Sequence, residues 1–163
     1  MTADAPTPVR LGPSDAGEVL TLQRAAYVTE ARAHDDLSLP PLTEELPAVR
    51  EELGRASVTA WGVRDDRGRL VAAVRVEVCD DVARVNRLVV APDRQGAGLG
   101  SGLLAFAEGR LGDAVTTVAL FTGEHSAGNL RLYRRAGYVE THRTGAGTYE
   151  LVHLTKARTS FSA

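Results

Sequence analysis

A run of apolar residues leads directly into a glycine-rich turn, and few folds accommodate this combination. Residues 88–90 are Leu-Val-Val, and the turn that follows contains Gly96, Gly98 and Gly100. These glycines lack a Cβ atom, so main-chain N–H groups can approach an anion closely. A helix that begins here adds the partial positive charge of its N-terminus. The stretch therefore predicts a strand, a turn and a helix that together bind a pyrophosphate.

Two common glycine motifs do not fit this stretch. The dinucleotide-binding fingerprint places glycines at i, i+2 and i+5, but Ser101 or Leu103 stands at the last of these positions. The P-loop requires a lysine directly after its last glycine, whereas the only lysine in the chain is Lys156. What remains is a Gln-x-x-Gly-x-Gly pattern that begins at Gln95.

A second pattern lies further along the chain, after an apolar strand that ends at Phe121. Asn129 and Tyr133 are four residues apart in the helix that follows, and Gly137 and Tyr138 close that helix. Residues four apart share one helix face. The two patterns, in this order, resemble the acyl-CoA-binding motifs of the GNAT superfamily of N-acyltransferases.

The resemblance implies a role for each motif. Residues 88–90 would bind the pantetheine amides and polarise the thioester carbonyl, and residues 95–101 would bind the pyrophosphate of acetyl-CoA, which acts as a co-substrate. Asn129 would hold the pantetheine arm, and Tyr133 would protonate the departing thiolate. The implied cofactor-binding residues are Leu88, Val89, Val90, Gln95, Gly96, Ala97, Gly98, Leu99, Gly100, Ser101, Asn129 and Tyr133.

The general base stays open between two glutamates. Glu77 lies in a strand next to the cofactor strand, and Glu124 lies in the turn after the second apolar strand. Either carboxylate can take a proton from the attacking amine, directly or through water. Many family members carry a glutamate near the end of the cofactor strand, where this chain has Asn86 and Arg87. That difference argues against a base on the cofactor strand.

By resemblance, the acceptor site is formed by residues 27–42 and 142–149. The first segment contains Glu30, Asp35 and Asp36, an acidic excess that would attract a cationic amine. We expect direct acetyl transfer, in a ternary complex, to the primary amine of a small molecule such as a small amine or an amino acid derivative. One alternative acceptor is a protein N-terminus or side chain. An alternative of another class is a non-catalytic domain that binds or senses acyl-CoA.

Composition narrows the class of protein. A chain of 163 residues can bury one core without disulfides. With 19 basic and 21 acidic side chains, it has no overall positive charge, so we expect neither a nucleic acid nor a membrane partner. Cys79 is the only cysteine and the four histidines lack metal-site spacing, so we expect no metal. A polar start without an apolar signal segment predicts a cytoplasmic protein, and the resemblance makes a homodimer plausible.

Periodicity and turn residues predict a mixed α/β fold. The expected strands are residues 9–11, 58–63, 70–78, 83–90, 116–121, 137–141 and 148–154. Three of the expected helices end near Tyr27, at Leu53 with Gly54 in the left-handed conformation, and, after the glycine turn, near Leu111. The helix that carries Tyr133 is expected to start after Ser126, which caps its N-terminus, and to close at Gly137 and Tyr138. Residues 30–42 are expected to form a loop over the fold.

The strand–helix–strand connection after residue 90 predicts that strands 83–90 and 116–121 pair in parallel. Hairpins make the other pairs antiparallel. The resulting expectation is a three-layer sandwich of the GNAT type, with a mostly antiparallel sheet, flanking helices and strands splayed at the cofactor slot. One domain is expected over residues 9–155, with flexible tails at 1–8 and 156–163.

Overall fold

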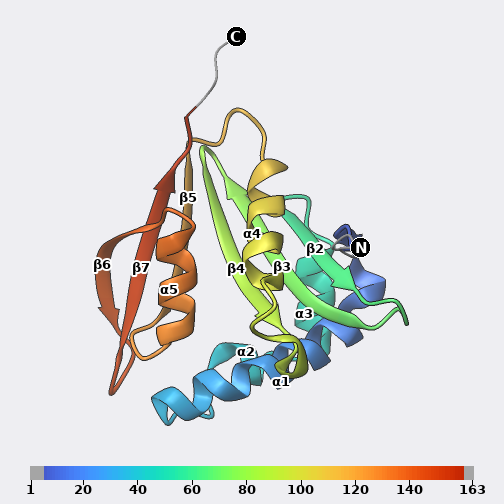
Figure 1. The fold of residues 1–163 in the computed structure, drawn as a ribbon, viewed down its shortest axis with the longest axis horizontal. Helices are drawn as coiled ribbons and strands as arrows, with labels where there is room; N and C mark the ends of the chain where they lie inside the picture. The colour runs from blue at the N-terminus through green and yellow to red at the C-terminus, as the bar shows by residue number, and fades with distance from the viewer. Residues whose placement is uncertain (1–5, 160–163) are drawn as a thin grey trace.

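The structure is a computed structural model that describes residues 6–159. Its strands form one seven-stranded sheet in the order β1-β2-β3-β4-β5-β7-β6 (Figure 1). The strands are β1 Val9–Leu11, β2 Val58–Arg64, β3 Leu70–Cys79, β4 Val82–Val90, β5 Thr117–Gly123, β6 Val139–Gly145 and β7 Glu150–Ala157. Strands β4 and β5 pair in parallel, and every other neighbouring pair is antiparallel. The predicted mixed sheet is confirmed.

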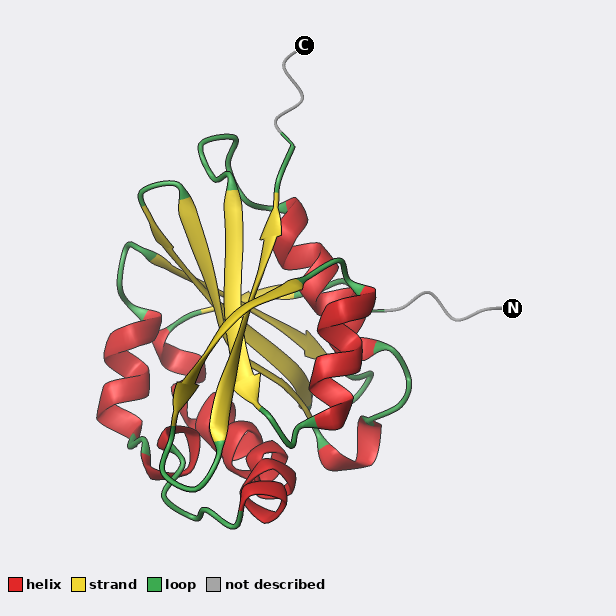
Figure 2. Ribbon diagram, turned by 90° about the vertical axis from the view of Figure 1, so that its left-hand side faces the viewer, coloured by secondary structure: helices red, strands yellow, loops and turns green. Residues whose placement is uncertain are grey.

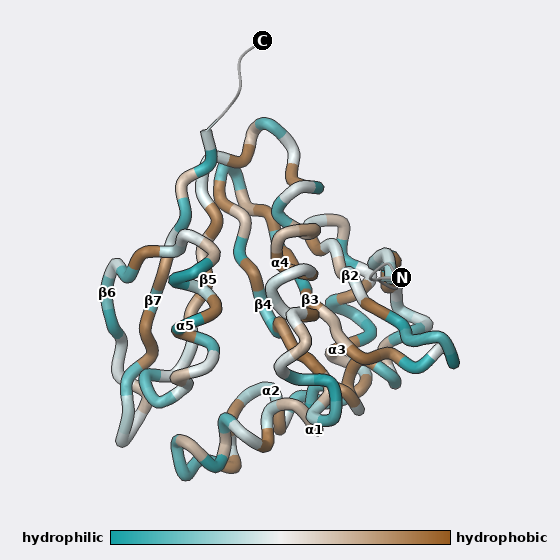
Figure 3. The backbone as a smooth tube through the Cα atoms, viewed as in Figure 1, coloured by the Kyte–Doolittle hydropathy of each residue, from teal (hydrophilic) through white to brown (hydrophobic). Residues whose placement is uncertain are grey.

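Helices cover both faces of this sheet (Figure 2). They are α1 Ala16–His34, α2 Pro40–Thr43, α3 Leu46–Leu53, α4 Leu99–Gly109 and α5 Ala127–Arg135, with 3-10 turns at Pro13–Asp15 and Pro92–Arg94. In β3 the seven residues from Leu70 to Val76 are all buried, as expected of a strand that is covered on both faces. Figure 3 shows the same contrast in hydropathy, since β3 is mostly apolar while the edge strand β6 is mostly polar.

Helix α1 continues to His34, past its predicted end at Tyr27, so the loop expected over residues 30–42 is partly wrong. Residues 30–34 are Glu-Ala-Arg-Ala-His, and burial of Ala31 and His34 extends the packed face of the helix. The helix ends at Asp35, which has a left-handed φ of 48°. Helix α2 then starts at Pro40. A proline fits the first helical turn, because its fixed φ suits a helix and its missing N–H has no intrahelical partner there.

Other predicted boundaries also differ in the structure: β5 continues to Gly123 instead of ending at residue 121, and β6 covers 139–145 instead of 137–141. Gly54 ends α3 with a φ of −94°, so it is not left-handed; its N–H instead bonds the carbonyls of Glu51 and Glu52 in a tightened last turn. Strand β7 runs to Ala157, beyond the domain end expected at residue 155, because its ladder with β5 continues to the pair Thr117 and Ala157. Of the predicted tails, residues 1–5 and 160–163 lie outside the described residues.

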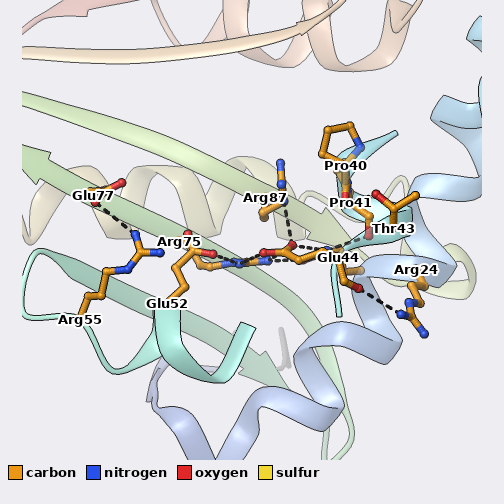
Figure 4. Close-up of polar contacts among 11 residues, drawn as sticks. Arg24, Pro40, Pro41, Thr43, Glu44, Glu52, Arg55, Arg75, Glu77 and Arg87 are labelled. Atoms are coloured by element: carbon orange, nitrogen blue, oxygen red, sulfur yellow. Dashed lines mark hydrogen bonds and ion pairs between the residues drawn. The ribbon is translucent and has the colours of Figure 1, made fainter. Parts of the chain in front are cut away.

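A buried charge network joins the sheet to the helices on one face. The side chain of Arg75 on β3 is only 2% exposed, and its guanidinium group donates to Glu44, Glu52 and Gln23 (Figure 4). Glu44 also accepts a hydrogen bond from Arg87 Nε on β4, at 3.4 Å. The network therefore connects α1, the segment after α2, and α3 to the middle of β3 and β4.

Candidate active site

Strands β4 and β5 pair at one end and separate at the other. Their ladder joins Val82–Arg84 to Thr117–Ala119 and goes no further, and the two strands diverge toward the lower side of Figure 1. The main-chain groups of Leu88–Val90 that face β5 therefore have no partner strand within the described chain. The predicted splay is confirmed, and it leaves hydrogen-bonding groups of β4 open to a ligand.

A bulge precedes this part of β4. The register between β3 and β4 shifts between Ala73 and Arg75, and Arg87 has a left-handed φ of 55°. A bulge of this kind turns the strand and re-aims the residues that follow it. The side chain of Arg87 bonds Glu44, so the bulge lies next to the buried charge network.

A cavity of about 700 Å³ lies where the strands separate. Its walls come from the end of β4, the glycine turn with the start of α4, one face of α1, and the first turns of α5. All of the predicted cofactor-binding residues line it except Ala97 and Tyr133. The structure therefore brings the two sequence motifs together around one space.

The glycine turn has the open geometry that an anion requires. Gly96 and Gly98 both have φ of 82°, and a Cβ atom added to either would meet nothing within 4 Å. Gly98 is also the N-cap of α4, whose first N–H groups are free of intrahelical partners. Gly100 differs, since an added Cβ would lie 3.3 Å from Leu132 Cδ1, so its lack of a side chain lets α4 and α5 approach each other.

At the other end of the cavity, Glu30 reaches from α1 to the start of α5. Its carboxylate accepts hydrogen bonds from Ser126 Oγ and, at 3.2 Å, from Asn129 Nδ2. Ser126 begins α5, but its hydroxyl does not cap the helix as predicted, because it bonds this carboxylate instead. Burial raises the pKa of the Glu30 carboxyl above its ordinary value, and His34 opposes this effect.

Tyr133 lies one helical turn after Asn129, as predicted, with only 6% of its surface exposed. Its ring centroid is 6.0 Å from that of Tyr138. Burial raises the pKa of the Tyr133 hydroxyl far above its ordinary value, and Tyr27 and Glu30 on the cavity wall raise it further. The hydroxyl is therefore a protonated group within electrostatic reach of the cavity.

Neither glutamate expected to be the base lies on the cavity wall. Glu77 pairs with Val58 toward the far end of β3, where its carboxylate is 3.7 Å from Arg55 (Figure 4). Glu124 Oε1 accepts the main-chain N–H of Glu150 at 2.9 Å, which ties the turn after β5 to β7. Both side chains have structural partners, so we do not propose either as the base.

Glu30 is the cavity carboxylate that sequence reasoning placed only in an acidic loop. The sequence does contain a pattern that would have placed Glu30 on the helix. Ala26, Glu30 and Ala33 are spaced by four and three residues and so share one helix face. The prediction stopped the helix at Tyr27, and this face was not extended to residue 30.

The two segments expected to form the acceptor site do meet. The hydroxyl of Tyr149 donates to Asp36 Oδ2 at 2.8 Å, and its ring centroid is 4.5 Å from that of His34. His34 Nε2 accepts the main-chain N–H of His125 at 3.1 Å, so its Nδ1–H donates to the carbonyl of Glu30 at 2.9 Å. These contacts hold the end of α1 against the turn before α5.

Within residues 6–159, no three His, Cys, Asp or Glu side chains are grouped so that they would hold a metal ion. In the same range, no helix combines the length and apolar character that a membrane span requires.

Comparison with known proteins identifies related sequences and structures. Residues 56–140 match the family model of the acetyltransferase (GNAT) domain, a range that includes the glycine turn and all of α5. No match was found among curated proteins.

Three solved structures have a similar fold. The ribosomal-protein-S18-alanine N-acetyltransferase from Escherichia coli superposes with a TM-score of 0.76 at 19% identity, covering 93% of this chain and 92% of that one. PaiA N-acetyltransferase from Thermoplasma acidophilum, in complex with coenzyme A, gives 0.77 at 14% identity, covering 90% and 96%. Mutant forms of the spermidine/spermine N-acetyltransferase SpeG from Vibrio cholerae give 0.67 at 17% identity, covering 93% of each chain.

Proposed function

Because the chain belongs to the GNAT acetyltransferase family and is therefore an acyltransferase, we propose that it transfers an acetyl group from acetyl-CoA to a primary amine of a small molecule. The amine attacks directly, with both substrates bound. One observation carries this proposal: a single cavity is lined by the glycine turn, the end of β4 beyond its ladder with β5, one face of α1 and the first turns of α5.

The glycine-turn end of the cavity fits the phosphates of acetyl-CoA. Gly96 and Gly98 leave open space in front of the N-terminus of α4, where main-chain N–H groups favour an anion. Three guanidinium groups line the same cavity and add positive charge: those of Arg94, Arg131 and Arg135. A volume of about 700 Å³ is ordinary for a cofactor site.

Residues of β4 and α5 would act on the thioester end of acetyl-CoA. When bound, acetyl-CoA supplies a thioester. The main-chain groups of Leu88–Val90 that lack a strand partner would bond the pantetheine amides and polarise the thioester carbonyl. The Tyr133 hydroxyl, whose pKa burial raises, is protonated at neutral pH and would donate that proton to the leaving sulfur.

Isothermal titration of the purified protein with acetyl-CoA, and separately with ATP and a nicotinamide dinucleotide, tests the proposal. We expect binding of acetyl-CoA alone, followed by release of free thiol when an amine acceptor is added. Failure to bind acetyl-CoA would overturn the proposal. Binding without turnover on any amine, peptide amines included, would support a non-catalytic acyl-CoA-binding domain.

Replacing Gly98 by valine is expected to weaken acetyl-CoA binding by about 10- to 100-fold. The side chain would occupy the space in front of the α4 N-terminus and displace one or two charge-assisted hydrogen bonds. Gly68→Val is the matched control, because Gly68 has the same φ of 82° and the same open surroundings but lies in the β2–β3 turn. Equal acetyl-CoA affinity in the two variants would contradict the role of the glycine turn.

The remaining expectations from the sequence stay predictions. They are a protein amine as the alternative acceptor, the absence of nucleic-acid and membrane partners, a homodimer, and a cytoplasmic location.

A further inference from the structure

The ring of His34 fills the space between the end of α1 and the end of β5. Only 6% of the surface of His34 is exposed. The ring lies directly over Gly123, because a Cβ atom added to that glycine would overlap Nε2 and Cε1 of the imidazole. The three atoms nearest to such a Cβ all belong to His34. The imidazole therefore occupies the place that a side chain at residue 123 would take.

The same ring bonds both sides of the space that it fills. Its Nε2 atom accepts the main-chain N–H of His125 at 3.1 Å, and its Nδ1–H donates to the carbonyl of Glu30 at 2.9 Å. An imidazole can accept at one nitrogen and donate at the other only in its neutral form. The ring of Tyr149 packs against it at a centroid distance of 4.5 Å. Packing and hydrogen bonds thus fix both the position and the tautomer of His34.

Helix α1 holds the start of α5 at two points. Glu30 accepts hydrogen bonds from Ser126 and Asn129, and His34, four residues later on α1, accepts the N–H of His125. Residues four apart on a helix share one face, with about 5–6 Å between their Cβ atoms. One attachment point would let the turn at residues 123–126 rotate about it. Two points fix the orientation of the turn as well as its distance from α1.

On the premise of the proposed function, we propose that His34 is a positioning residue of the reaction, and that its fit over the bare Gly123 sets the distance and angle between two walls of the cavity. One wall is the α1 face between residues 26 and 33, and the other is formed by residues 125–129. The second wall includes Asn129, which would hold the pantetheine arm. His34 itself does not line the cavity, so it acts through the turn. A misplacement of about 1 Å can cost a reaction about 100-fold in rate.

Two substitutions of His34 separate positioning from space filling. In His34→Gln the side-chain oxygen lies as many bonds from Cα as Nε2 does and can accept the His125 N–H, whereas in His34→Leu no acceptor remains. We expect kcat/KM for an amine acceptor to fall by about 10- to 100-fold in His34→Leu but only by about fivefold or less in His34→Gln. Acetyl-CoA affinity should stay within about fivefold in both variants, because the phosphates bind at the distant glycine turn. A ring that only fills space predicts the reverse order, since leucine is the better apolar filler.

Gly123→Ala tests the fit from the other side. Its new Cβ atom would displace the imidazole, so kcat/KM should fall by about 10- to 100-fold although no contact is removed by the substitution itself. In a His34→Ala background the space is open, and adding Gly123→Ala should change kcat/KM by less than about threefold, because residues in contact have non-additive effects. Gly145→Ala is the matched control, since an added Cβ there would meet nothing within 4 Å. Additive effects of the two substitutions would contradict the inference.

The outcomes separate this inference from the proposed function. A wild-type protein that does not bind acetyl-CoA refutes the proposed function. A wild-type protein that acetylates an amine while His34→Leu matches His34→Gln, or while acetyl-CoA affinity falls as far as kcat/KM in His34→Leu, keeps its function and refutes the positioning role of His34. If His34→Leu does not fold, as judged by circular dichroism, Gly123→Ala decides, and wild-type kcat/KM in that variant refutes the inference.

Discussion

Replacing Tyr133 by phenylalanine is expected to lower turnover by about 10- to 1,000-fold on any acceptor, while acetyl-CoA affinity stays within a few-fold. The substitution removes the proton donor but keeps the ring that packs against Tyr138. A tyrosine hydroxyl is protonated throughout the neutral range, and burial moves the pKa of Tyr133 further above it. Steady-state kinetics with an amine acceptor, together with titration of acetyl-CoA, measure the two effects separately.

Tyr138→Phe is the matched control for this prediction. It removes a buried hydroxyl that donates to Glu108 Oε1 at 2.6 Å, on the side of α5 that faces α4 and β7. Glu108 keeps its ion pair with Lys156, so the loss should be about 1 kcal/mol of unfolding free energy, with turnover preserved. If Tyr133→Phe turns over as fast as Tyr138→Phe, Tyr133 does not donate the proton.

The parts of the site that could be predicted from the sequence are local. The strand–turn–helix of residues 88–101 is contiguous in the chain. Its glycines indicate a backbone with positive φ, which the structure has at Gly96 and Gly98. That Asn129 and Tyr133 lie on one helix face follows from their spacing of four residues alone. Because a strand–helix–strand connection normally gives parallel pairing, the direction of β4 relative to β5 also followed from the order of elements.

The parts that could not be predicted depend on contacts between distant segments. Glu30 is 96 positions from Ser126 in the chain, and no local pattern signals that the two side chains bond. Ser126 has the residue type and place of an N-cap, yet the partly buried carboxylate of Glu30 is a stronger partner for its hydroxyl than the helix end. In the same way, Arg75 stands in an apolar strand, and only the fold brings acidic side chains from two other segments to it.

Replacing Arg75 by alanine is expected to lower the free energy of unfolding by about 3–5 kcal/mol, measured by urea denaturation at neutral pH. The guanidinium group is 2% exposed and lies between Glu44 and Glu52. Its removal leaves Glu52 without the positive partner that it has in the wild type, and leaves Glu44 with Arg87 alone. Arg67→Ala, at an exposed turn position, is the control and should change stability by no more than about 0.5 kcal/mol.

The pH dependence of this difference follows from the pKa of Glu44. Burial raises that pKa, but the Gln23 amide and the guanidinium groups of Arg75 and Arg87 lower it by more, so the folded pKa lies below the ordinary value. A carboxyl with a lowered folded pKa stabilises the fold above its unfolded pKa, and this contribution is lost as the pH falls through the folded pKa. The stability difference between wild type and Arg75→Ala should therefore shrink on acidification. A difference that is below about 1 kcal/mol at neutral pH, or that grows as the pH falls, would mean that Arg75 is not the counter-ion that holds the network together.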